Sequence, residues 1–192
     1  MNQIKPWLIS AGSALAIFLF LSMLYMSPAL EGKNISQHDI IQYQGSVKEI
    51  KDFEAQTGDE VLWTNSMFGG MPSYLISNRT QANLLRNLHL MLTLNNWRPV
   101  CFIFLYLLGF YLSLLAFGVN RWLSIVGAIA YAFSAYFLQI IVAGHISKVL
   151  ALGYMPPIIA GVHLAFRRRY LLGGLLMGTF LSLQILVNHL QI

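Results

Sequence analysis

Carboxylate groups occur in only one part of this chain of 192 residues. All seven acidic residues lie in the polar stretch that separates the first apolar segment from the rest: Glu31, Asp39, Glu49, Asp52, Glu54, Asp59 and Glu60. A carboxylate can serve as a general base, a nucleophile or a ligand of a hard metal ion. Asp39 follows the end of the first apolar segment by about a dozen residues. We therefore expect residues 27–97 to be the working loop of a membrane enzyme, with the apolar segments as its scaffold.

The composition is typical of a membrane protein. Hydrophobic residues make up 57% of the chain and charged residues only 10%, and the mean hydropathy is +0.62. Soluble domains carry about 25% charged residues. The formal charge of +5 then reflects membrane topology rather than binding to nucleic acid, which we do not expect as a partner. The single cysteine, Cys101, cannot form a disulfide within the chain.

Five apolar runs predict five transmembrane helices, at residues 7–26, 99–117, 122–142, 149–166 and 170–187. A cleaved signal peptide is the alternative for the first run. With the N-terminus in the cytoplasm, Lys5, Arg121 and the run Arg167–Arg169 all lie inside, as the positive-inside rule requires. The loop 27–97 and the turns near residues 145 and 189 then share the extracytoplasmic face, together with the lipid bilayer's outer surface.

The long loop carries its own periodic patterns. Ser36 and Asp39 have the spacing of a capping box, with Asp in place of the usual Glu. Apolar residues at helical spacing predict one amphipathic helix over 37–56. A second amphipathic helix is expected over 81–94, lying on the membrane surface. Between them, residues 63–74 form a loop rich in aromatic, glycine and amide groups.

Several residues are candidates for ligand contacts, and each also has a purely structural interpretation. Trp63, Asn65 and Tyr74 could contact a sugar or could plug the helix bundle. Lys148 could bind a phosphate or could only extend toward the membrane interface. The histidines His38, His145 and His189 could contact substrate or, with Asp39, hold a divalent metal ion, although interfacial histidines are more often hydrogen-bonded surface residues. Because all these residues share one membrane face, we expect them to converge around Asp39.

Four segments together resemble one family of bacterial membrane proteins. They are Gln37-His38-Asp39, the segment from Leu62 to Tyr74 with its Phe-Gly-Gly-Met-Pro sequence, the segment from Ala143 through Lys148 to Pro156, and residues 188–191. The combination resembles the YfhO family, most of all its versions from Bacteroidetes-type bacteria. That family belongs to the GT-C class of multi-spanning glycosyltransferases, and its members are much longer than 192 residues. The resemblance implies that residues 1–192 form the N-terminal part of a GT-C-like membrane domain in the bacterial cytoplasmic membrane.

The resemblance also implies an activity. Enzymes of the GT-C class take a sugar from a polyprenyl-phosphate carrier on the outer side of the membrane, and here the acceptor would be a cell-envelope glycan or lipid. An acidic residue soon after the first span acts in that class as catalytic base or metal ligand, and Asp39 occupies the matching position. The sequence leaves the cofactor unknown, with a divalent metal as one option.

A transporter or lipid-handling protein without chemistry is the alternative function. Transporters place polar groups and broken helices near the middle of the membrane. Pro156-Pro157 predicts a kink in the fourth span, which favours this alternative. The charged residues instead cluster at one membrane face, which favours the transferase.

In the fifth span, Gly174 and Gly178 are spaced for helix packing.

Overall fold

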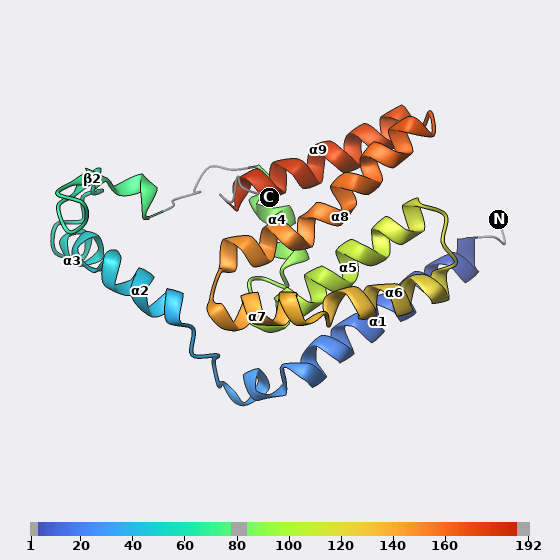
Figure 1. Cartoon of the computed structure of the whole chain (residues 1–192), viewed down its shortest axis with the longest axis horizontal. Coiled ribbons are helices and arrows are strands. Elements are labelled where there is room, and N and C mark those ends of the chain that lie inside the picture. Colours follow the sequence, from blue (N-terminus) through green and yellow to red (C-terminus); the bar gives the residue numbers. More distant parts are fainter. Residues whose placement is uncertain (1–3, 78–83, 188–192) are drawn as a thin grey trace. The chain divides into compact units, whose positions relative to one another are not determined.

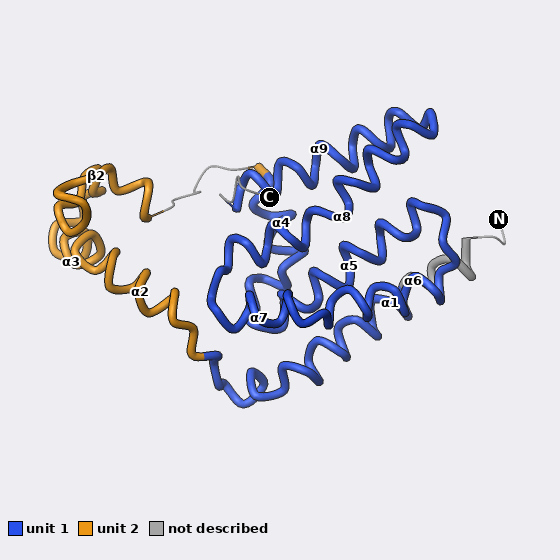
Figure 2. The backbone as a smooth tube through the Cα atoms, in the orientation of Figure 1, with its two compact units in different colours: residues 1–35, 85–192 blue, residues 36–84 orange. Residues whose placement is uncertain are grey.

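The chain is helical through most of its length and forms two compact units. The computed structural model describes residues 4–77 and 84–187, and for residues 4–11 the backbone only. Unit 1 comprises residues 1–35 and 85–192, and unit 2 comprises residues 36–84 (Figure 2). The expected all-α architecture is confirmed, apart from one short hairpin in unit 2.

Unit 1 is a bundle of apolar helices. Along the chain these are α1 (Ile4–Tyr25), the short helix η1 (Ser27–Glu31), α4 (Arg86–Leu92), α5 (Val100–Ala116), α6 (Arg121–Ala132), α7 (Ala135–Ala143), α8 (Ile146–Phe166) and α9 (Tyr170–Leu186). Helix α5 contacts α1, α6 and α8, and α8 also packs along α9 (Figure 1). Because three helices surround α5, much of its side-chain surface is hidden, and Phe102, Ile103 and Tyr106 are fully buried.

The predicted spans match these helices except for the third. The expected span 122–142 is broken into α6 and α7, which are bent by 48° relative to each other. The break falls at Phe133 and Ser134, and Ser134 caps α7 in an extended conformation. The prediction of a span over 122–142 did not include this bend, because hydropathy does not register a change of helix direction. Serine is a preferred N-cap residue, and Ser134 was the only local signal.

By length and composition, one helix of the described residues could cross a membrane, namely Ile146–Phe166. The bent pair α6–α7 is a second candidate if it counts as one broken span. Helices α5 and α9, and α1 from residue 12 onward, are apolar but shorter. The helical fold is therefore established, whereas membrane insertion is part of the proposed function.

Helix α8 accommodates its two prolines without ending. Pro156 and Pro157 lie inside the continuous helix, and the expected kink stays a prediction. A proline cannot donate to the carbonyl four residues earlier, so the carbonyls of Leu152 and Gly153 lose their usual partners. The Tyr131 hydroxyl of α6 donates to the Leu152 oxygen at 3.2 Å. The Gly153 oxygen faces Gly109 of α5 so closely that a Cβ there would overlap it.

The glycines that allow α8 and α9 to approach are not the expected ones. A Cβ on Gly173 would lie 2.6 Å from the Gly161 carbonyl oxygen and 2.7 Å from the Ala165 nitrogen. Gly174 and Gly178 face open space, since a Cβ added at either would meet nothing within 4 Å. Gly173, rather than the expected pair Gly174 and Gly178, therefore allows the contact with α8, because small-residue spacing does not reveal which helix face is turned toward a neighbour.

Unit 2 contains two short helices and a hairpin. Its elements are α2 (His38–Ser46), α3 (Lys48–Thr57), β1 (Trp63–Thr64), β2 (Met71–Pro72) and the short helix η2 (Ser73–Leu75). The strands pair antiparallel, with Trp63 opposite Pro72. The single helix expected over 37–56 is wrong, since the chain turns at Val47 between α2 and α3. Val47 and Ile50 are both fully buried.

Two further local predictions need correction. Gln37 is the N-cap of α2, so Ser36 lies outside the helix and does not form the expected capping box with Asp39. The second amphipathic helix, expected over 81–94, is α4 at Arg86–Leu92, and residues 81–83 lie outside the described residues. Leu85 and Leu88 pack against the core of unit 1, as an amphipathic helix on that bundle requires.

Candidate functional site

The first candidate residues lie at the beginning of α2. His38 is the first residue of the helix and Asp39 the second. The Nε2 atom of His38 lies 2.8 Å from the side-chain nitrogen of Gln42, one turn later. Asp39 is half-buried in the first turn, where the positive end of the helix dipole stabilises a carboxylate. The Asp39 carboxylate at this position can contact a cation or a hydrogen-bond donor.

A second carboxylate, Glu49 of α3, holds the hairpin in place. The Thr64 hydroxyl donates to Glu49 Oε2 at 2.6 Å, and the Ser66 amide donates to the same oxygen at 3.0 Å. The hydrogen bond from Thr64 lowers the pKa of Glu49, with the Ser66 donors adding to the effect. Sequence reasoning missed this role, since fifteen residues separate Glu49 from Thr64 and no short motif marks the pair.

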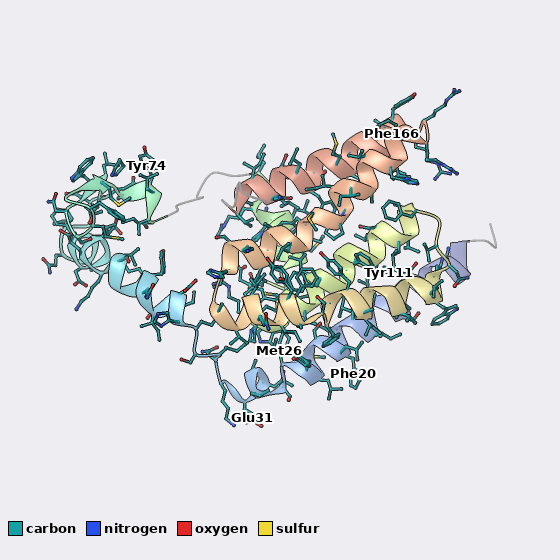
Figure 3. The ribbon with its side chains drawn as sticks, in the orientation of Figure 1. Phe20, Met26, Glu31, Tyr74, Tyr111 and Phe166 are labelled. Atoms are coloured by element: carbon teal, nitrogen blue, oxygen red, sulfur yellow. The ribbon has the colours of Figure 1, made fainter. Side chains whose placement is uncertain are left out.

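The hairpin presents the predicted aromatic residues to solvent. The Trp63 indole N–H donates to Asn65 Oδ1 at 3.2 Å. A Cβ on Gly70 would lie 2.9 Å from the indole nitrogen, so only glycine leaves room for the Trp63 ring there. Trp63 is 55% exposed and Tyr74 is 68% exposed. Figure 3 labels Tyr74 among the side chains of this unit. We call Trp63, Asn65 and Tyr74 the hairpin surface.

The tip of the hairpin adds an aromatic residue that sequence reasoning did not single out. Phe68 is 88% exposed and has a positive φ of 53°. Gly69 and Gly70 follow it with positive φ values as well. A bulky residue in this backbone region is uncommon and carries strain. The turn therefore displays an aromatic side chain that gains little from the fold of the unit itself.

The remaining predicted contact residues lie in unit 1, at the start of α8. His145 is the N-cap residue of α8, and Lys148 lies in its first turn. The Lys148 ammonium is 5.6 Å from the centre of the Tyr136 ring in α7. The Lys148 side chain therefore makes a cation–π contact with α7. His189 lies outside the described residues, and the convergence of these groups with Asp39 stays a prediction.

The expected metal site of Asp39, His38, His145 and His189 also stays a prediction. Among residues 4–77 and 84–187, no group of three or more His, Cys, Asp or Glu side chains could hold a metal ion. The expected set of Asp39, His38, His145 and His189 draws on both units and on a residue that is not described.

One partly buried polar pair in unit 1 was not anticipated. His89 Nδ1 of α4 lies 2.8 Å from the Tyr154 hydroxyl of α8, 65 residues away in the chain. Burial lowers the pKa of His89, the Asn96 side chain opposes this by hydrogen bonding, and the charge of Arg98 lowers it further. These surroundings favour the neutral form of the imidazole. No local signal links the two residues, because only the fold brings α4 onto α8.

Comparisons with known proteins found no relative of this chain. Neither the protein-family models nor the curated proteins nor the solved structures match the chain. A function for the chain is consequently inferred from the residues and contacts described above.

Proposed function

We propose that the chain is the N-terminal part of a membrane glycosyltransferase that takes a sugar from a polyprenyl-phosphate carrier and transfers it to a cell-envelope acceptor outside the cytoplasmic membrane. The observation that carries this proposal is the hairpin surface of Trp63, Asn65 and Tyr74. Aromatic faces pack against the apolar C–H groups of sugar rings, while an amide donates to and accepts from hydroxyl groups. The surface is held in shape by Glu49 and Gly70 and still leaves both rings exposed.

The outer surface of unit 1 supports a place in the membrane. Large apolar side chains are exposed along its helices: Phe20, Leu24, Leu123, Val126, Ile159, Phe166, Leu171, Leu175 and Ile185. Figure 3 labels Phe20 on α1 and Phe166 at the end of α8. Extensive apolar surface in contact with water is unfavourable, and such surfaces mark contacts with lipid or protein. A bilayer is the partner that covers all these faces at once.

The chemistry assigned to Asp39 is that of a general base. The acceptor hydroxyl oxygen attacks the anomeric carbon of the donor sugar and gives its proton to the Asp39 carboxylate. The bond between the anomeric carbon and the phosphate oxygen breaks, and the phosphate leaves on the lipid with the bonding electron pair. Hydrogen-bond donors or a positive charge must stabilise that leaving group. The half-buried first-turn position of Asp39 is consistent with this role.

Replacing Tyr74 tests the sugar-binding role of the hairpin surface. Tyr74→Ala removes an exposed aromatic face, so we expect the KM for the sugar donor to rise about two- to tenfold. The kcat should change less, because Tyr74 is not assigned to the chemical step. The measurement is the transfer of labelled sugar from a polyprenyl-phosphate donor, in membranes that contain the full-length protein.

Leu75→Ala is the matched control, since Leu75 is the exposed neighbour of Tyr74 but has no aromatic face. Its KM should equal that of the unaltered protein. Equal kinetics for Tyr74→Ala and Leu75→Ala would remove the hairpin surface from donor binding.

A transport or lipid-handling function is the second candidate, favoured by the broken pair α6–α7. Helix breaks inside a bundle are where transporters bind their substrates. Movement of a polyprenyl phosphate across the bilayer without any sugar transfer would favour this alternative.

A further inference from the structure

The turn between α8 and α9 consists of three consecutive arginines. Arg167 is the C-cap of α8, Arg168 follows it, and Arg169 is the N-cap of α9. All three residues are exposed. We call Arg167–Arg169 the arginine turn. Because its residues are adjacent in the chain, three positive charges lie at one end of the pair α8–α9.

The backbone of the arginine turn adopts a conformation that usually belongs to glycine. The Arg168 amide donates to the Ala165 oxygen at 2.9 Å. The Arg169 amide donates to the Leu164 oxygen at 3.0 Å, which completes the hydrogen-bond pattern of a Schellman motif. The left-handed position of this motif is occupied by Arg168, with a φ of 62°, although glycine is the usual residue there. A side chain is disfavoured in this backbone region, so the arginine is retained there at the expense of stability.

No carboxylate of unit 1 neutralises the arginine turn. Among the described side chains, those of Arg167 to Arg169 form no ion pair and no cation–π contact. The sequence contains no acidic residue after Glu60, so α4 to α9 supply none. The acidic residue that unit 1 does contain, Glu31, pairs with Lys33. A partner for the three charges therefore comes from outside unit 1.

Large apolar side chains flank the arginine turn on both helices. Phe166, the last residue of α8 and labelled in Figure 3, is 86% exposed. Tyr170 and Leu171, the first residues of α9, are also largely exposed. Such a change from apolar to cationic side chains matches the boundary between acyl chains and headgroups in a bilayer, where aromatic rings are favoured. A nucleic acid or a free phosphate ion would pair with the arginines but leave the apolar side chains in water.

Packing directly behind the arginine turn fixes its position. A Cβ on Gly173 would overlap the Ala165 backbone, so α8 and α9 are in close contact one turn of helix away. The Gly173 amide donates to the Arg169 oxygen at 2.8 Å. The backbone of the turn is thus already ordered, which lowers the entropic cost of binding a ligand.

We propose that the arginine turn binds the headgroups of anionic phospholipids, in the leaflet that surrounds this end of α8 and α9. The guanidinium groups donate hydrogen bonds to the phosphate oxygens, and the exposed apolar side chains beside them contact the acyl chains. The proposal rests on the membrane placement in the proposed function but not on sugar transfer. It also goes beyond the positive-inside rule, which concerns the side of the membrane and not the lipid.

Titration of the purified chain in dodecyl maltoside with dioleoyl phosphatidylglycerol or dioleoyl phosphatidylcholine, followed by native mass spectrometry, tests this surface. Both lipids carry a phosphate, but the choline cation offsets its charge. We expect the unaltered protein to bind phosphatidylglycerol at least about tenfold more tightly, since each arginine at an anionic lipid surface contributes about fivefold.

Arg168→Gly separates lipid binding from folding. The affinity for phosphatidylglycerol should fall about fivefold, because one guanidinium group is lost. The melting temperature should stay the same or rise, because glycine adopts a positive φ without strain. Lys51→Gln is the matched control, since it removes an exposed cation from α3 and should leave the affinity for phosphatidylglycerol unchanged.

Any of four results would overturn the proposal. Arg168→Gly could bind phosphatidylglycerol as tightly as the unaltered protein, or Lys51→Gln could weaken binding as much as Arg168→Gly. The two lipids could bind equally well. Glycerol phosphate or a short single-stranded RNA could displace phosphatidylglycerol at equal concentration, which would assign the arginines to a soluble anion or to nucleic acid. By contrast, binding of phosphatidylglycerol that depends on Arg168, in a full-length protein that transfers no sugar, would keep this surface and remove the transferase function.

Discussion

At the scale of single residues, the two carboxylates Asp39 and Glu49 have opposite kinds of surroundings. Glu49 accepts hydrogen bonds from Thr64 and Ser66 at Oε2, so it holds the hairpin against α3 within unit 2. Asp39 lies half-buried in the first turn of α2. Glu49 therefore has a structural role, and the proposed chemistry is assigned to Asp39.

Glu49→Gln should loosen the hairpin and remove its sensitivity to acid. The pKa of Glu49 is below the ordinary value of 4.5 in the folded unit, so its stabilisation is complete above that pH. The stabilisation is lost as the pH falls through the lowered, folded-state pKa. A glutamine still accepts hydrogen bonds, but a neutral acceptor is weaker. Exchange of the Ser66 amide with deuterium, followed by NMR or mass spectrometry, should become severalfold faster in the variant.

Asp52→Asn is the control for this change, because Asp52 is an exposed carboxylate of the same helix. Its hairpin exchange rates should match those of the unaltered protein between pH 3 and 7, a range of about four units around the glutamate pKa. Unchanged Ser66 exchange in Glu49→Gln would show that the Glu49 carboxylate contributes nothing to holding the hairpin.

At the scale of elements, close helix contacts depend on which glycine faces inward. Gly173→Leu places a side chain against the Gly161 oxygen and the Ala165 nitrogen, both of them backbone atoms of α8 that cannot rotate away. We expect the free energy of unfolding to fall by roughly 1–3 kcal/mol, the usual range for overpacking. Gly174→Leu meets open space and should change it by less than about 0.5 kcal/mol.

Thermal or denaturant unfolding of both variants in detergent micelles gives this comparison directly. Similar losses of stability in Gly173→Leu and Gly174→Leu would mean that α8 and α9 do not pack through Gly173.

The elements also show what sequence patterns can and cannot reveal. Continuous apolar runs predicted α1, α5, α8 and α9 to within a few residues, because a run of apolar residues favours a helix that buries its backbone groups. The bend at Ser134 and the turn at Val47 escaped prediction, since no glycine or proline occupies either position. The contacts between His89 and Tyr154 and between Tyr106 and Phe137 depend on packing between distant segments, which no local pattern encodes.

At the scale of the whole molecule, the chain combines an apolar helical unit with a polar unit that has an exposed aromatic surface. Unit 1 also contains polar groups in an otherwise apolar bundle. The Leu152 carbonyl accepts a hydrogen bond from Tyr131, the pair α6–α7 is broken, and the Lys148 ammonium lies over the Tyr136 ring. Within unit 2, Trp63 and Tyr74 remain exposed although the unit has its own buried core. The exposed rings of unit 2 are the feature on which the proposed binding of a sugar depends.

The most direct test of the transferase proposal is the rate of sugar transfer by Asp39→Asn. Asparagine has nearly the shape of aspartate, so α2 should form as before. An amide cannot accept the acceptor's proton, and the lost base catalysis should lower kcat about 10²- to 10⁴-fold. The assay follows labelled sugar from a polyprenyl-phosphate donor into the acceptor, with Asp52→Asn as the control that keeps full activity. Near-normal transfer by Asp39→Asn, or no transfer by the unaltered full-length protein, would contradict the proposed function.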